Sequence, residues 1–128
     1  MGGFGTKKKE KKFSSKKFLN LNEKELKEKS IKHHTNGDLI KAEKGYIAFI
    51  NNGYSDADII SNYALICQER GDTRKAIKLY EDCIYKFPIH LFSRINLAFL
   101  YYSLDYLEKA QSIINEAIEI KDNIANGY

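Results

Sequence analysis

The sequence predicts an all-α fold, a solenoid of three stacked helix-turn-helix repeats, and three observations lead to this prediction. First, residues 57–90 form two amphipathic segments around Gly71-Asp72, since apolar residues recur three, four and seven positions apart, and Pro88 closes the unit. Second, the key positions of this hairpin return after 34 residues in both directions. Third, a single hairpin of this kind cannot hide both apolar faces from water, so it requires neighbours.

The 34-residue register is clearest at the small residues. The turn column holds Gly37, Gly71 and Asp105, and the small residue that lies five positions later is always alanine, at Ala42, Ala76 and Ala110. Three packing columns keep the same register, namely Ser30, Ala64 and Ala98, then Tyr46, Tyr80 and Ile114, then Phe49, Cys83 and Ala117. The chain therefore contains an internal repeat.

This repeat resembles the tetratricopeptide repeat (TPR) family, whose unit has this length and carries an aliphatic and small pair, an aromatic residue, alanine, a second aromatic and proline. The resemblance covers roughly residues 23–122 and implies a TPR α-α superhelix. We expect a disordered lysine-rich leader at 1–18, a degenerate first repeat at 23–56, and further repeats at 57–90 and 91–124. Residues 125–128 look like the start of a fourth repeat or a ragged end.

Capping and breaking residues set the expected helix ends. Asn22 is a plausible cap for a first helix that reaches about Thr35, and its partner helix covers 39–51. Ser55 or Asp56 caps the next helix, and the last helix is expected to run from Leu107 to about Ile120.

Three residues depart from the repeat pattern. Lys29 and His33 occupy columns that are apolar or aromatic in the later repeats, as suits an end unit whose outer face meets water. Arg94 replaces an apolar residue, and we expect its stem to pack while its guanidinium reaches solvent.

Composition narrows the class of protein. The chain has 128 residues, of which 43% are hydrophobic and 30% charged, a balance typical of one soluble globular domain. No run approaches the ~20 apolar residues of a membrane span, and no secretory signal is visible, so we expect a cytoplasmic protein. Cys67 and Cys83 fall on packing columns and are interpreted as structural thiols.

Positive charge is concentrated in the leader. Residues 1–17 carry a charge of +6, which leaves −2 for the rest of the chain. Three interpretations of Lys7–Lys17 stay open: a solubilising segment, weak contact with an anionic surface, or the second signal for a myristoylated Gly2, because Met1–Thr6 satisfies that short pattern.

Catalytic and metal-binding motifs are missing from the sequence. His33 and His34 are adjacent on a helix and point about 100° apart, so they do not form a chelate together. No phosphate loop, nucleophile elbow or zincin pattern occurs. We expect no enzyme activity, no cofactor and no metal.

The TPR resemblance implies a concave groove that is lined by the first helix of each repeat. Its expected lining changes from basic, through polar, to aromatic along the chain, with Lys24, Lys27, Ile31 and His34, then Asp58, Ser61, Asn62, Leu65 and Gln68, then Phe92, Ile95, Asn96, Phe99 and Tyr102. Chaperone-binding members of the family hold an acidic C-terminus with a carboxylate clamp. That clamp is incomplete here, since Ile31, Phe92 and Asn96 stand where asparagine, lysine and arginine are needed.

We therefore predict a non-catalytic scaffold or adaptor module that binds a peptide or partner protein in this groove. One alternative is the N-terminal TPR region of a longer enzyme, for example a transferase, that presents substrate or partners to a catalytic domain. The opening Gly-Phe-Gly and lysine-rich leader loosely resemble bacterial, cyanobacterial-type TPR proteins of that kind. The third repeat carries no polar capping helix, so further repeats or self-association are also expected ways of covering it.

Overall fold

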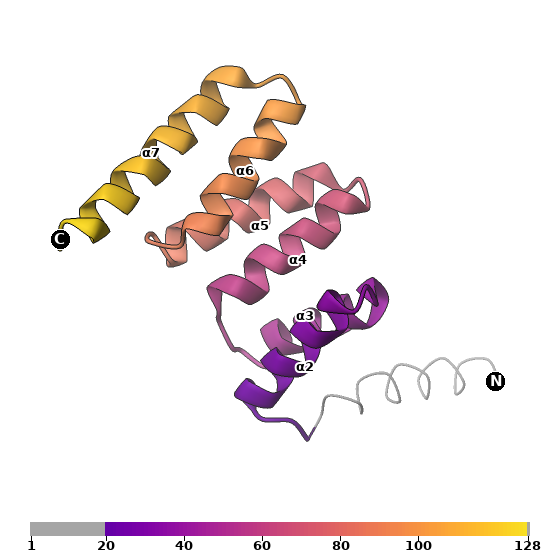
Figure 1. Ribbon diagram of the computed structural model, residues 1–128. Helices are drawn as coiled ribbons and strands as arrows, with labels where there is room; N and C mark the ends of the chain where they lie inside the picture. The colour runs from indigo at the N-terminus through magenta and orange to yellow at the C-terminus, as the bar shows by residue number, and fades with distance from the viewer. Residues whose placement is uncertain (1–19, 128) are drawn as a thin grey trace. The chain divides into compact units, whose positions relative to one another are not determined.

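The computed structural model describes residues 20–127, and over this range it consists of α-helices without any strand (Figure 1). The helices are α2 (Glu23–Thr35), α3 (Leu39–Asn51), α4 (Ala57–Glu69), α5 (Thr73–Lys86), α6 (Leu91–Ser103) and α7 (Leu107–Ala125). The prediction of an all-α fold is confirmed. The lysine-rich leader at 1–18 lies outside the described residues.

The chain divides into two compact units, Met1–Ser55 and Asp56–Tyr128. The described part of the first unit is the hairpin of α2 and α3. The second unit contains the hairpins α4–α5 and α6–α7, and within it α6 packs against α5 and, less extensively, against α4.

The turns inside the three hairpins share one geometry. Their central residue has a positive φ, at Gly37 (82°), Gly71 (89°) and Asp105 (65°). The next residue donates its N–H over 2.9 Å to the carbonyl five positions earlier, as Asp38 to His33, Asp72 to Cys67 and Tyr106 to Tyr101. This closure is the Schellman type of helix end, which favours glycine at the positive-φ position because glycine has no Cβ.

Polar side chains cap most of the helix starts. Asn22 and Glu25 form a capping box on α2, with N–H to oxygen distances of 2.8 and 3.2 Å. Asp56 accepts from the N–H of Ile59 at the start of α4, as the sequence predicted. The N-cap residue of α7 is Tyr106, whose side chain makes no capping hydrogen bond.

The repeated alanines are buried in all three hairpins. Ala42 and Ala76 are fully buried and Ala110 is nearly so. This shared burial agrees with the internal repeat that the sequence predicts.

Two local features differ from expectation. Helix α7 continues to Ala125 and is followed by Gly127 at φ 82°, instead of stopping near Ile120. The reason is that Asp122, unlike Pro88 in the preceding repeat, does not stop a helix.

Arg94 is the second difference. It is buried, and its Nη1 donates to the carbonyl of Pro88 rather than reaching solvent. Its Nε finds no hydrogen-bond partner among the described residues. The guanidinium thus holds the connection into α6 instead of extending outward.

Candidate functional site

A hydrogen bond ties the two helices together in each of the first two hairpins. His34 Nδ1 and the Tyr46 hydroxyl lie 2.8 Å apart, and 34 residues later the Tyr80 hydroxyl donates to Gln68 Oε1 over 3.0 Å. Both tyrosines are completely buried. Burial raises the pKa of Tyr80, which keeps its hydroxyl protonated as the donor.

The third hairpin lacks this link. The equivalent residues are Tyr102 on α6 and Ile114 on α7, and isoleucine has no hydroxyl to donate. Where Tyr46 and Tyr80 place an aromatic ring between their helices, the third hairpin has a branched aliphatic side chain.

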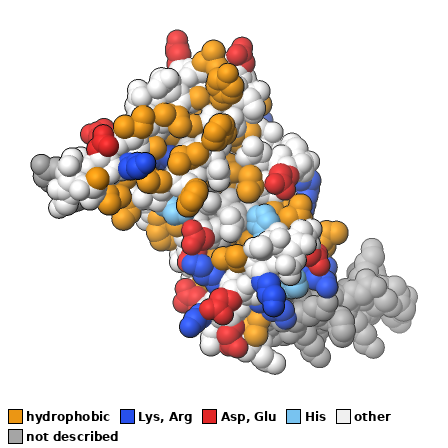
Figure 2. Space-filling model, in the orientation of Figure 1, with side chains coloured by type: hydrophobic (Ala, Val, Ile, Leu, Met, Phe, Trp, Pro, Cys, Tyr) orange, Lys and Arg blue, Asp and Glu red, His pale blue; other side chains and the backbone are white. Residues whose placement is uncertain are grey.

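Helix α6 is apolar on two sides. Leu97 and Tyr101 are buried, and burial also raises the pKa of the Tyr101 hydroxyl. On the other side Phe92, Phe99 and Tyr102 are each about two-thirds exposed, at 68%, 67% and 67%. Figure 2 shows hydrophobic side chains gathered over α6 and α7. Large aromatic side chains that are exposed together on one helix indicate a surface for a partner.

The other residues predicted to line a groove differ in accessibility. In the second unit Asn62, Leu65, Gln68, Ile95 and Asn96 are half-buried. Ser61 is only 3% exposed, so it is the least accessible of the residues predicted to line the groove in this unit, and its place in the lining stays a prediction. A small serine is readily enclosed by larger neighbours.

The basic residues belong to the first unit. Lys24 is exposed on α2, whereas Lys27 and His34 are half-buried, and His34 contacts the Tyr46 hydroxyl and ring. Asp58, at the start of α4, pairs with His90 Nε2 at 3.1 Å. The predicted lining residues on α4 and α6 therefore belong to the second unit, and those on α2 belong to the first unit.

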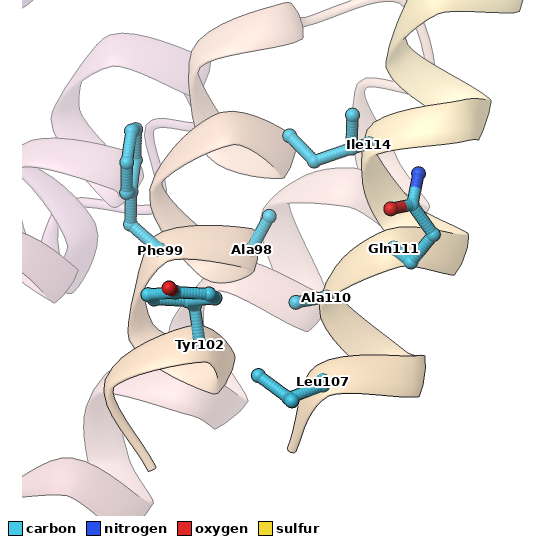
Figure 3. Close-up of a pocket in the computed structure, with 7 residues that line it drawn as sticks. All are labelled: Ala98, Phe99, Tyr102, Leu107, Ala110, Gln111 and Ile114. Atoms are coloured by element: carbon cyan, nitrogen blue, oxygen red, sulfur yellow. The ribbon is translucent and has the colours of Figure 1, made fainter. Parts of the chain in front are cut away.

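A pocket of ≈ 280 Å³ opens between α6 and α7. Ala98 on α6 and Leu107, Ala110 and Ile114 on α7 project into the space between the two helices (Figure 3). Phe99, Tyr102 and Gln111 complete the lining. The α7 residues were missed in the sequence analysis, although the change from tyrosine to isoleucine at position 114 was a visible signal.

A second cavity of ≈ 570 Å³ lies beside α5 and the turn that precedes α7. Its lining includes the charged residues Arg74, Lys78 and Glu81, whereas the lining of the α6–α7 pocket includes no charged residue.

The cysteines serve packing. Cys67 and Cys83 are both buried and not bonded to each other, and Cys83 Sγ donates to the Ala57 carbonyl over 3.4 Å. Burial raises the pKa of the Cys83 thiol, which disfavours the reactive thiolate. Within residues 20–127, no three His, Cys, Asp or Glu side chains come together in a way that could hold a metal ion. In the same range no helix combines the length and apolar character needed to cross a membrane.

Comparison with known proteins identifies the repeat. Residues 93–124 match the family model described as tetratricopeptide repeat. The structure is similar to the TPR2B domain of yeast Sti1 in its complex with pHsp70, with a TM-score of 0.73, 22% identity, and coverage of 82% of this chain and 84% of that chain. This likeness shows a shared fold. No curated protein matches the sequence.

Proposed function

We propose that this chain is a non-catalytic scaffold or adaptor module that binds a peptide or a partner protein, because residues 93–124 match the tetratricopeptide repeat model and the fold is similar to that of a TPR domain. The similar Sti1 domain was solved in complex with pHsp70, which supports a protein or peptide partner. Binding is proposed for the groove face of α4 and α6 in the second unit.

The exposed aromatic side of α6 carries this proposal. Phe92, Phe99 and Tyr102 leave most of their rings in contact with water, while the opposite side of the same helix is already buried in the second unit. Removing these rings from water on binding is favourable, and aromatic anchors commonly supply most of the binding energy of an interface.

The electrostatics favour an uncharged ligand segment. Arg94 is the only charged residue in α6, and it is buried with its guanidinium on the Pro88 carbonyl. The outward side of α6 therefore offers no cation for an acidic C-terminus, in agreement with the incomplete carboxylate clamp. A neutral, apolar segment fits this surface with the least desolvation cost.

Selection from a random peptide library against the full chain tests the proposal. Affinities of the selected peptides are then measured by fluorescence anisotropy for the wild type and for Phe99→Ala and Tyr102→Ala. We expect each substitution to weaken binding about 10-fold or more, which is the effect of truncating a central aromatic anchor.

Tyr85→Ala is the matched control, because Tyr85 is 88% exposed and lies on α5. It should leave the affinity unchanged. Failure to select any peptide, or equal losses in all three variants, would reject the α4 and α6 face as the binding surface.

A further inference from the structure

The pocket between α6 and α7 lies where the two preceding hairpins each bury a tyrosine ring. In the second hairpin Tyr80 projects from α5 and its hydroxyl reaches Gln68 on α4, so the ring spans the space between the helices. In the third hairpin Ile114 and Tyr102 hold the corresponding positions. The pocket is therefore the site of an aromatic ring that this hairpin does not supply.

Its size agrees with this origin. A cavity of about 150 Å³ lined by aliphatic side chains accepts benzene. The pocket here measures ≈ 280 Å³, which leaves room for a substituted ring. Ala98 and Ala110 contribute only methyl groups to its walls, and both are buried, so the floor of the pocket is apolar.

The second unit shows which kind of element packs on the side of a hairpin that faces the next repeat. On the second hairpin α6 packs against α5 and α4, and Leu97 and Tyr101 on α6 are buried. The third hairpin presents the same face one repeat later, and no described residue occupies it. Continuation of the α6 interface calls for a helix with a similar aromatic-bearing stripe.

We propose that the α6–α7 pocket receives the tyrosine side chain of an uncharged, apolar helical segment of a partner protein. This inference rests on the proposed function, because it names the anchor of the same partner. The partner's ring takes the position that Tyr46 and Tyr80 take in their own hairpins.

A phenol suits the pocket better than a charged side chain. The pocket lining contains no charged residue, so an ion would lose its hydration without compensation. Gln111 uses its amide N–H to bond Asn115 Oδ1 at 2.9 Å, and its amide oxygen accepts no hydrogen bond from residues 20–127. That oxygen can accept from a phenol, as Gln68 accepts from Tyr80.

The small molecule 4-methylphenol, which is the side chain of tyrosine, tests the pocket directly. We expect it to bind the full chain with a dissociation constant on the order of 1–10 mM, as befits a ligand of this size. Methyl NMR signals of Ala98, Ala110 and Ile114 should shift on titration, whereas the buried methyl of Ala76 in the second hairpin should not. Shifts spread evenly over the protein would overturn the proposal.

Ile114→Tyr fills the pocket with the chain's own ring and should weaken binding of 4-methylphenol about 10-fold or more, because the ligand is then excluded. Asn123→Tyr is the control, since it adds the same ring at an exposed position on α7 that does not line the pocket. If Ile114→Tyr does not fold, the double variant Tyr102→Gln/Ile114→Tyr, which copies the Gln68 and Tyr80 pair, carries the test. Unchanged 4-methylphenol binding in the folded variant would refute the pocket.

The selected peptides separate this inference from the proposed function. Phe92→Ala changes the aromatic face outside the pocket, and Ile114→Tyr changes the pocket. Loss of peptide binding in both variants supports both the proposed function and the role of the pocket. Loss of peptide binding in Phe92→Ala alone refutes the pocket as the anchor site and leaves the proposed function standing. If neither variant loses peptide binding, both proposals are refuted. A dimer in sedimentation velocity that Ile114→Tyr abolishes would make a second copy the occupant and overturn the partner assignment.

Discussion

Replacing Asp105 by glycine should stabilise the second unit. Asp105 holds a φ of 65° at the turn position where the other two hairpins carry Gly37 and Gly71. This left-handed conformation costs a residue with a Cβ about 1–2 kcal/mol, and the cost for aspartate lies at the lower end of that range. Glycine removes this cost but adds about 0.5–1 kcal/mol of unfolded-chain entropy. The net gain expected is about 0.5 kcal/mol.

The reverse substitution provides the matched test. Gly71 has a φ of 89°, and a Cβ built there meets no atom within 4 Å. Gly71→Asp therefore introduces backbone strain without a steric clash, and it should lower the free energy of unfolding by about 0.5 kcal/mol, the same net difference with the opposite sign. The two substitutions thus shift stability in opposite directions at equivalent turns.

Urea unfolding followed by circular dichroism at 222 nm measures both changes. The urea concentration at the midpoint of unfolding should rise for Asp105→Gly and fall for Gly71→Asp. The m-value, which is the slope of the unfolding free energy against urea concentration, should not change, because unfolding exposes the same surface area. Destabilisation by Asp105→Gly would refute the reasoning. It would mean that the aspartate side chain makes a stabilising contact that outweighs the backbone strain.

Three further predictions concern buried and capping groups. Tyr80→Phe should cost about 1 kcal/mol, since Gln68 loses its donor. Because burial raises the pKa of Tyr80, wild-type stability should fall as pH rises above about 10, and Tyr80→Phe should reduce that fall in pH-dependent melting. Asp56→Ala should cost about 1 kcal/mol in urea unfolding by removing the cap of α4, and an unchanged midpoint would contradict the cap. Cys67 and Cys83, both buried, should react with a thiol reagent only as fast as the unit opens, so rapid labelling of the native protein would contradict their burial.

The sequence was informative about the hairpins because their packing repeats. Alanine recurs every 34 residues, and Ala42, Ala76 and Ala110 are all buried, as expected of a packing position. Asn22 and Asp56 were recognisable as caps because a cap depends on residues a few positions away. Local rules therefore predicted most helix ends.

Features that depend on tertiary surroundings were less accessible to sequence reasoning. A serine is compatible with a groove and with a packed interior, so the burial of Ser61 needed the structure. The pocket was not predicted because the expected groove was lined only by the first helix of each repeat, and α7 is a second helix. In addition, Ile114 by itself is an ordinary core residue. Only comparison with Tyr46 and Tyr80 shows that Ile114 leaves space.

The arrangement of neighbours in the second unit also bears on how fast it folds. Helix α4 packs against α5, α5 against α6, and α6 against α7, so most partners are adjacent in the chain. Few long loops must close before contacts form, and the entropy of loop closure stays small. Low contact order of this kind is typical of helical domains that fold on the order of microseconds to milliseconds, with α4–α5 or α6–α7 equally able to nucleate.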